Sequence, residues 1–156
     1  MKSSKLFLIL MISISWLSLA FVGKKSIKRF LPASLFMAIL VKAVNILARK
    51  RRWWWWYKTI HPSVSGEFPF VWGSFFVGSL WILKFTYGNL RKYLGLNLIA
   101  HSIFTYILEP FLQKSGIASL VRLKKIQLMY VFMVLALILY GFQHLKEKVS
   151  LRELSR

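Results

Sequence analysis

Five long apolar segments constrain this chain more than any other feature of its sequence. They cover residues 6–22, 30–48, 68–85, 93–112 and 126–142. An α-helix needs roughly 20 residues, and at least about 17, to cross a hydrocarbon core of about 30 Å. All five segments reach that limit. They predict transmembrane helices, because a soluble bundle of such segments would have no polar face to present to water.

The loops between these segments are short, so neighbouring helices should run antiparallel. We therefore predict an all-α fold, an integral membrane helical bundle of four to five transmembrane helices. It forms a single transmembrane domain over residues 1–156 that ends in a short charged tail at residues 143–156. Lys2 and Lys5 precede the first segment as they would in a signal peptide, but further spans follow, which favours an uncleaved helix.

The charge composition fits a membrane protein and disfavours an enzyme. The net charge is +19, and the mean hydropathy is +0.55. The cations lie in clumps between apolar segments, as in multi-pass membrane proteins, and not over one face as in nucleic-acid-binding proteins. The chain has neither cysteine nor aspartate, which excludes disulfides, thiolate catalysis and aspartate-containing triads. We therefore expect a basic, non-enzymatic protein with no cofactor, no metal and no nucleic-acid partner.

The distribution of cations leaves the number of spans open. With five spans, each side of the membrane carries 11 lysines and arginines, so the positive-inside rule gives no orientation. The second segment is the weakest candidate, because small or polar residues follow one helical face: Ser34, Ala38, Lys42, Asn45, Arg49 and Arg52. This helix either spans with that stripe against other helices or lies in the interface. The second alternative divides the cations 14 against 9 and places both termini outside.

A basic and aromatic cluster follows the second segment. It contains Arg49, Lys50, Arg51, Arg52, Trp53, Trp54, Trp55, Trp56, Tyr57 and Lys58. Indole rings prefer the headgroup level of a bilayer, and Arg and Lys pair with lipid phosphates. Since the cations precede the aromatics, the chain should turn along the surface after Arg52. We interpret residues 50–58 as an in-plane anchor on anionic headgroups; a specific lipid or protein contact and single-stranded nucleic acid are weaker alternatives.

Two further patterns lie on the third and fourth segments. Polar residues recur at four-residue steps along the fourth: Tyr93, Asn97, His101, Thr105 and Glu109. Such a stripe forms either hydrogen bonds between helices or a path for ions or protons, and we favour the first. On the third segment, Gly73, Ser74 and Gly78 predict a close helix contact, within one chain or between two copies.

Three stretches resemble small, uncharacterised multi-pass membrane proteins of bacteria: WWWWYKTIHPSVSGEFPF, FVGSLWILKFTYGN and GIASLVRLKKIQL. The resemblance implies the bacterial inner membrane and supplies no activity. We expect a structural protein or an accessory subunit of a membrane complex, whose partners are anionic lipid and either a membrane protein or a second copy. The alternative is a small transporter or channel component that uses the polar stripe of the fourth segment.

Overall fold

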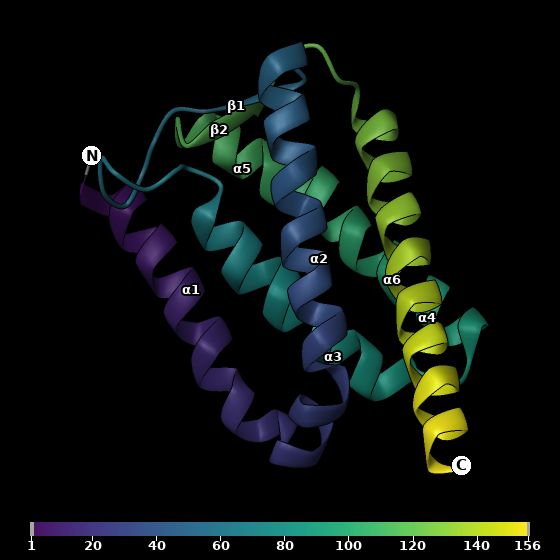
Figure 1. Cartoon of the computed structure of the whole chain (residues 1–156). Coiled ribbons are helices and arrows are strands. Elements are labelled where there is room, and N and C mark those ends of the chain that lie inside the picture. The colour runs from purple at the N-terminus through teal and green to yellow at the C-terminus, as the bar shows by residue number, and fades with distance from the viewer. Residues whose placement is uncertain (1, 156) are drawn as a thin grey trace.

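The computed structural model describes residues 2–155, and helices make up most of it (Figure 1). The helical elements are α1 (Lys2–Val22), α2 (Lys24–Arg51), the π-helical η1 (Phe70–Phe75), α3 (Phe76–Thr86), α4 (Leu90–Ile103), the π-helical η2 (Phe104–Leu108), α5 (Glu109–Lys114) and α6 (Lys125–Leu154). Two short strands, β1 (Trp54–Trp56) and β2 (Ala118–Leu120), pair antiparallel. The helical prediction is confirmed, and the strand pair is an addition that the sequence analysis did not anticipate.

Among the residues that the structure describes, three helices are long and apolar enough to cross a membrane: α1, α2 and α6. The third apolar segment forms a shorter helical stretch over Phe70–Thr86, and π-helical η2 divides the fourth. Large apolar side chains remain exposed on the outer faces, including Phe21 at 78%, Ile39 at 69% and Tyr130 at 67%. Extended apolar surface of this kind is typical of a face that contacts lipid. The chain is therefore that of a helical membrane protein.

Helix α2 packs against α3 and α6, and α1 lies at the periphery against η1 and α3 (Figure 1). The inner face of α2 includes Ser34, Ala38 and Asn45, all of them buried. These three members of the small and polar stripe therefore face the interior of the bundle, whereas Lys42, Arg49 and Arg52 are exposed. Of the two arrangements that the sequence left open, the contacts favour the one in which this helix lies within the bundle.

The helices run alternately between two ends of the bundle, so the N-terminus and the C-terminus lie at opposite ends (Figure 1). One end carries the strands and the loops at residues 52–69 and 115–124, and we call it the strand end. The tight turns at the opposite end contain Gly23 (φ 90°) and Gly88 (φ 97°). These left-handed conformations favour glycine, and they allow α2 and α4 to reverse direction at once.

Candidate functional site

The tryptophan run forms a strand across the strand end of the bundle. Trp54 pairs with Leu120 and Trp56 with Ala118, and the backbone N–H of Tyr57 donates to the carbonyl of Ile117 at 2.8 Å. Successive side chains of a strand point to opposite faces. Two of the indoles therefore point inward while the one between them points away.

The inward indoles pack on the bundle. The ring of Trp56 lies 4.7 Å from that of Phe70, and the Trp54 Nε1 donates to Asn45 Oδ1 at 2.9 Å. Trp55, by contrast, is 42% exposed and Tyr57 is 56% exposed. The chain does leave the helix at Arg52, as we expected, but Trp54 and Trp56 contribute to packing as well as to the aromatic surface.

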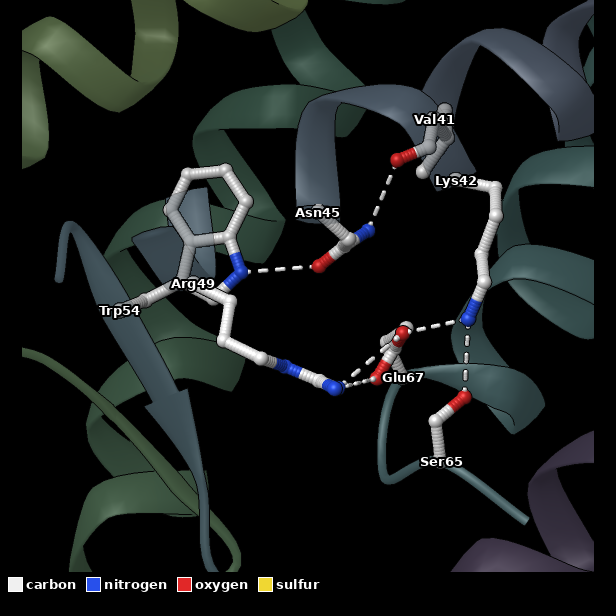
Figure 2. A network of polar contacts seen from close by, with 7 residues as sticks. All are labelled: Val41, Lys42, Asn45, Arg49, Trp54, Ser65 and Glu67. Atoms are coloured by element: carbon white, nitrogen blue, oxygen red, sulfur yellow. Dashed lines mark hydrogen bonds and ion pairs between the residues drawn. The ribbon is translucent and has the colours of Figure 1, made fainter. Parts of the chain in front are cut away.

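A polar network joins α2 to the loop that follows the strand (Figure 2). At its centre is Glu67, which is only 2% exposed. Its carboxylate accepts from Lys42 Nζ at 2.7 Å and from Arg49 Nη2 at 3.2 Å. Lys42 also donates to Ser65 Oγ at 3.0 Å. Two cations of the α2 stripe therefore hold one buried carboxylate.

Burial by itself would raise the pKa of Glu67, because it disfavours the charged form. The hydrogen bond from Lys42, a bond from its own backbone N–H and the charges of Lys42 and Arg49 outweigh that effect, and the pKa of Glu67 is lowered. A carboxyl group whose pKa is lower in the folded state stabilises the fold above its unfolded pKa. That stabilisation is lost as the pH falls through the folded value.

The remaining cations of the basic cluster are free of this network, and Lys50, Arg51 and Arg52 among them are exposed. Lys50 and Arg51 line a hollow of about 570 Å³ together with Trp53 and Arg122, which comes from the loop after β2. Arg52 caps α2 in the left-handed conformation, with φ 55° and ψ 42°. A second loop thus adds positive charge to the cluster that the sequence analysis identified.

The polar stripe of the fourth segment faces the interior throughout. Its members are all buried: Tyr93, Asn97, His101, Thr105 and Glu109. Three of them contact α6. The Tyr93 hydroxyl donates to the Ala136 carbonyl at 2.6 Å, Thr105 Oγ1 lies 3.3 Å from Met129 Sδ, and Glu109 Oε2 lies 3.6 Å from Lys125 Nζ.

The other two members do not join helices. Asn97 Nδ2 donates to the carbonyl of Tyr93 on the same helix at 2.9 Å. Within residues 2–155, the Nδ1 of His101 has no hydrogen-bond partner, and its ring lies 5.0 Å from that of Phe132. Glu109 pairs with Lys125 and not with His101. Hydrogen bonding between helices therefore accounts for only part of the stripe.

The small residues of the third segment have different surroundings. A Cβ at Gly73 would lie 3.4 Å from the Cα of Ile12, so this glycine is at the contact with α1. Ser74 Oγ lies 3.7 Å from Met11 Sδ on the same helix α1. A Cβ at Gly78 would meet nothing within 4 Å. The close contact that the sequence predicts is thus present at Gly73 and is not found at Gly78.

Glu67 was not among the candidate site residues that the sequence indicated. The available signal was the spacing of Lys42 and Arg49, seven residues apart on one helical face. No family model, curated protein or solved structure matches the chain.

Proposed function

We propose that the chain is a non-enzymatic multi-pass protein of the bacterial inner membrane, structural or an accessory subunit of a membrane complex, whose strand end binds anionic lipid headgroups. The observation that carries this proposal is the conformation of Arg52, which has a positive φ of 55° in a position where glycine is the usual residue. The left-handed conformation costs an L-residue about 1–2 kcal/mol. Because arginine occupies this position despite the cost, we infer that its guanidinium charge binds a partner at the strand end.

The surroundings of Arg52 support a lipid headgroup as the partner. Lys50, Arg51 and Arg122 are exposed at the same end, and Trp55 is exposed on the strand beside them. Basic residues next to a membrane gain about 1 kcal/mol each from anionic lipid, and indole rings favour the same level of the bilayer. The two classes of side chain occur here together.

We further propose five crossings of the membrane, by α1, α2, η1 with α3, α4 to α5, and α6. The alternating direction of these elements (Figure 1) and the burial of Ser34, Ala38 and Asn45 on α2 support this count. The 17 residues of Phe70–Thr86 are just enough for one crossing. The helical stretch over residues 90–114 is longer and also suffices.

Topology can be tested with single cysteines, since the chain has none of its own. Lys25→Cys, in the first turn of α2, and Lys58→Cys, beyond its C-terminal end, lie on either side of the apolar segment 30–48. We expect an impermeant thiol reagent to label only one of the two in intact cells, because a spanning α2 separates them by a membrane. Permeabilised cells are the control, and both cysteines should react there. Labelling of both positions in intact cells, or of neither, would contradict a spanning α2.

Lipid binding can be tested at Arg52 in proteoliposomes. We expect Arg52→Gly to reduce the preference for phosphatidylglycerol over phosphatidylcholine about fivefold, the equivalent of about 1 kcal/mol. The same variant should be more stable than wild type by about 1 kcal/mol, since glycine adopts the left-handed conformation without strain. Quenching of tryptophan fluorescence by brominated forms of each lipid measures the preference.

The matched control is Arg52→Lys, which keeps both the charge and the strained conformation. It should retain the lipid preference of the wild type and gain no stability. An unchanged preference in Arg52→Gly would refute headgroup binding at this position, whatever its effect on stability.

A further inference from the structure

Two cavities lie inside the bundle, on either side of three phenylalanine rings. The cavity nearer the strand end has a volume of about 50 Å³, and Trp54, Trp56 and Glu109 are among its lining residues. The second has a volume of about 150 Å³, and we call it the histidine cavity because His101 lines it together with Asn97. Phe75, Phe104 and Phe132 line both cavities. We call these three residues the phenylalanine barrier.

The barrier is made by three different helical elements. Phe75 ends η1, Phe104 begins η2, and Phe132 belongs to α6. The ring centroids lie 6.2 Å apart for Phe75 and Phe104, 5.4 Å for Phe75 and Phe132, and 5.3 Å for Phe104 and Phe132. Two of the rings sit at the ends of π-helical segments, which often occur at functional sites. Because all three rings line both cavities, they lie between them.

A titratable group with a buried atom that makes no hydrogen bond in the described chain lies on each side of the barrier. His101 is 8% exposed and its Nδ1 has no hydrogen-bond partner in the described chain. Glu109 Oε2 is likewise buried without a hydrogen bond, and its nearest charge is Lys125 at 3.6 Å. At least about 90% of buried polar groups in proteins have a partner, which is often ordered water. The Nδ1 of His101 therefore requires a polar occupant of its cavity, and Glu109 Oε2 can accept a hydrogen bond from one in addition to its ion pair with Lys125.

Water satisfies this requirement. A buried water needs about 10–15 Å³ of such volume and two to four polar partners. The histidine cavity, at about 150 Å³, has room for several, and His101, Asn97 and Tyr93 supply polar atoms. The smaller cavity has an almost wholly apolar lining, so its place for water is beside Glu109 and the buried Trp56 Nε1, which also lacks a hydrogen bond in the described chain. Between His101 and Glu109 the helix rises about 12 Å, at 1.5 Å per residue, and the barrier occupies the middle of that distance.

We propose that the two cavities hold water and form a proton path that the phenylalanine barrier closes. In the open state, a hydrated proton binds the free ring nitrogen of His101, and the other ring nitrogen releases its proton to water, which carries it past the barrier to the Glu109 carboxylate. Glu109 then releases that proton to water at the strand end, and a flip of the His101 ring restores the starting tautomer. Only N–H and O–H bonds form and break. This activity goes beyond headgroup binding at Arg52 and does not depend on it.

The remaining titratable groups near the path are few. Tyr93 lines the histidine cavity, but its hydroxyl already donates to the Ala136 carbonyl. Lys125 of α6 faces Glu109 from outside the cavity. The lining residues from α2, η1 and α3 are not titratable: Met37, Ser74, Phe75, Gly78, Ser79 and Ile82. His101 and Glu109 are thus the groups whose removal should stop proton transfer.

The test is proton flux into proteoliposomes that contain a pH-sensitive dye, after a pH jump. We expect slow flux for the wild type and an increase of at least about tenfold for Phe104→Leu, which shortens one ring of the barrier. Phe36→Leu is the matched control, because Phe36 stacks on Phe142 at 4.3 Å away from the cavities, and it should remain slow. Adding His101→Gln or Glu109→Gln to Phe104→Leu should restore the slow rate.

Flux that persists in Phe104→Leu with His101→Gln, or a sodium flux as large as the proton flux, would mean a nonspecific leak and overturn the proposal. No increase in a folded Phe104→Leu would overturn it as well. Hydration is measured separately on the wild type. The chain has three histidines, so ¹⁵N-labelled imidazole gives a simple spectrum in which His101→Gln identifies one signal. We expect magnetisation transfer from water to His101, and a dry His101 would exclude the path even if no barrier variant folds.

Discussion

Replacing Lys42 and Arg49 together by methionine is expected to destabilise the fold by about 3–5 kcal/mol, the usual cost of leaving a buried charge without its partners. Glu67 is only 2% exposed, and these two cations are its ion-pair partners within the described chain. Lys42→Met alone should cost about 1.5–3 kcal/mol, since Arg49 remains. Unfolding by dodecyl sulfate in mixed micelles, followed by circular dichroism, measures the free energy.

The companion variant separates the charge from lost packing. Adding Glu67→Gln to the double substitution removes the unpaired carboxylate while keeping its size, and should recover most of the stability. The pH dependence is a second measurement. Wild type should lose stability as the pH falls through the lowered pKa of Glu67, and a Glu67→Gln variant should lack that component. A double variant as stable as wild type would show that this network does not hold the loop.

The parts of this fold that follow from local periodicity could be predicted from the sequence. Apolar segments of 17 or more residues predict helices in a membrane, and the four-residue spacing from Asn97 to Glu109 places their side chains on one face. The structure buries that face. The small and polar stripe of α2 was equally visible in the sequence. However, a spanning helix whose stripe faces other helices and a helix that lies in the membrane interface have similar residue patterns. Only packing against α3 and α6 distinguishes them.

The parts that depend on distant contacts could not be predicted in this way. Trp56 pairs with Ala118 across more than sixty residues, and nothing near either residue indicates that register. The alternation of packed and exposed tryptophans follows from the strand pairing, so the local sequence alone does not indicate which of them are packed. The barrier formed by Phe75, Phe104 and Phe132 has the same origin, because each phenylalanine is an ordinary apolar residue within its own segment.

Gly66→Ala is expected to destabilise the strand end by about 1–3 kcal/mol, the range typical of an overpacked site. A Cβ at this position would lie 2.5 Å from the Cβ of Trp56 and 2.9 Å from the carbonyl oxygen of Lys58. Neither atom can move without shifting the backbone of the strand or its continuation. Because Ser65 and Glu67 flank Gly66, displacing the loop would also weaken both contacts to Lys42.

Gly78→Ala is the matched control, and its effect should have the opposite sign. A Cβ at Gly78 would have no atom within 4 Å, so it adds no steric conflict. Alanine stabilises a helix interior by about 0.5–1 kcal/mol relative to glycine, mostly by lowering the entropy of the unfolded chain. The same unfolding measurement in mixed micelles compares both variants with the wild type. If Gly66→Ala were neutral, the loop would not pack on Trp56; if Gly78→Ala were strongly destabilising, Gly78 would have to contact another chain.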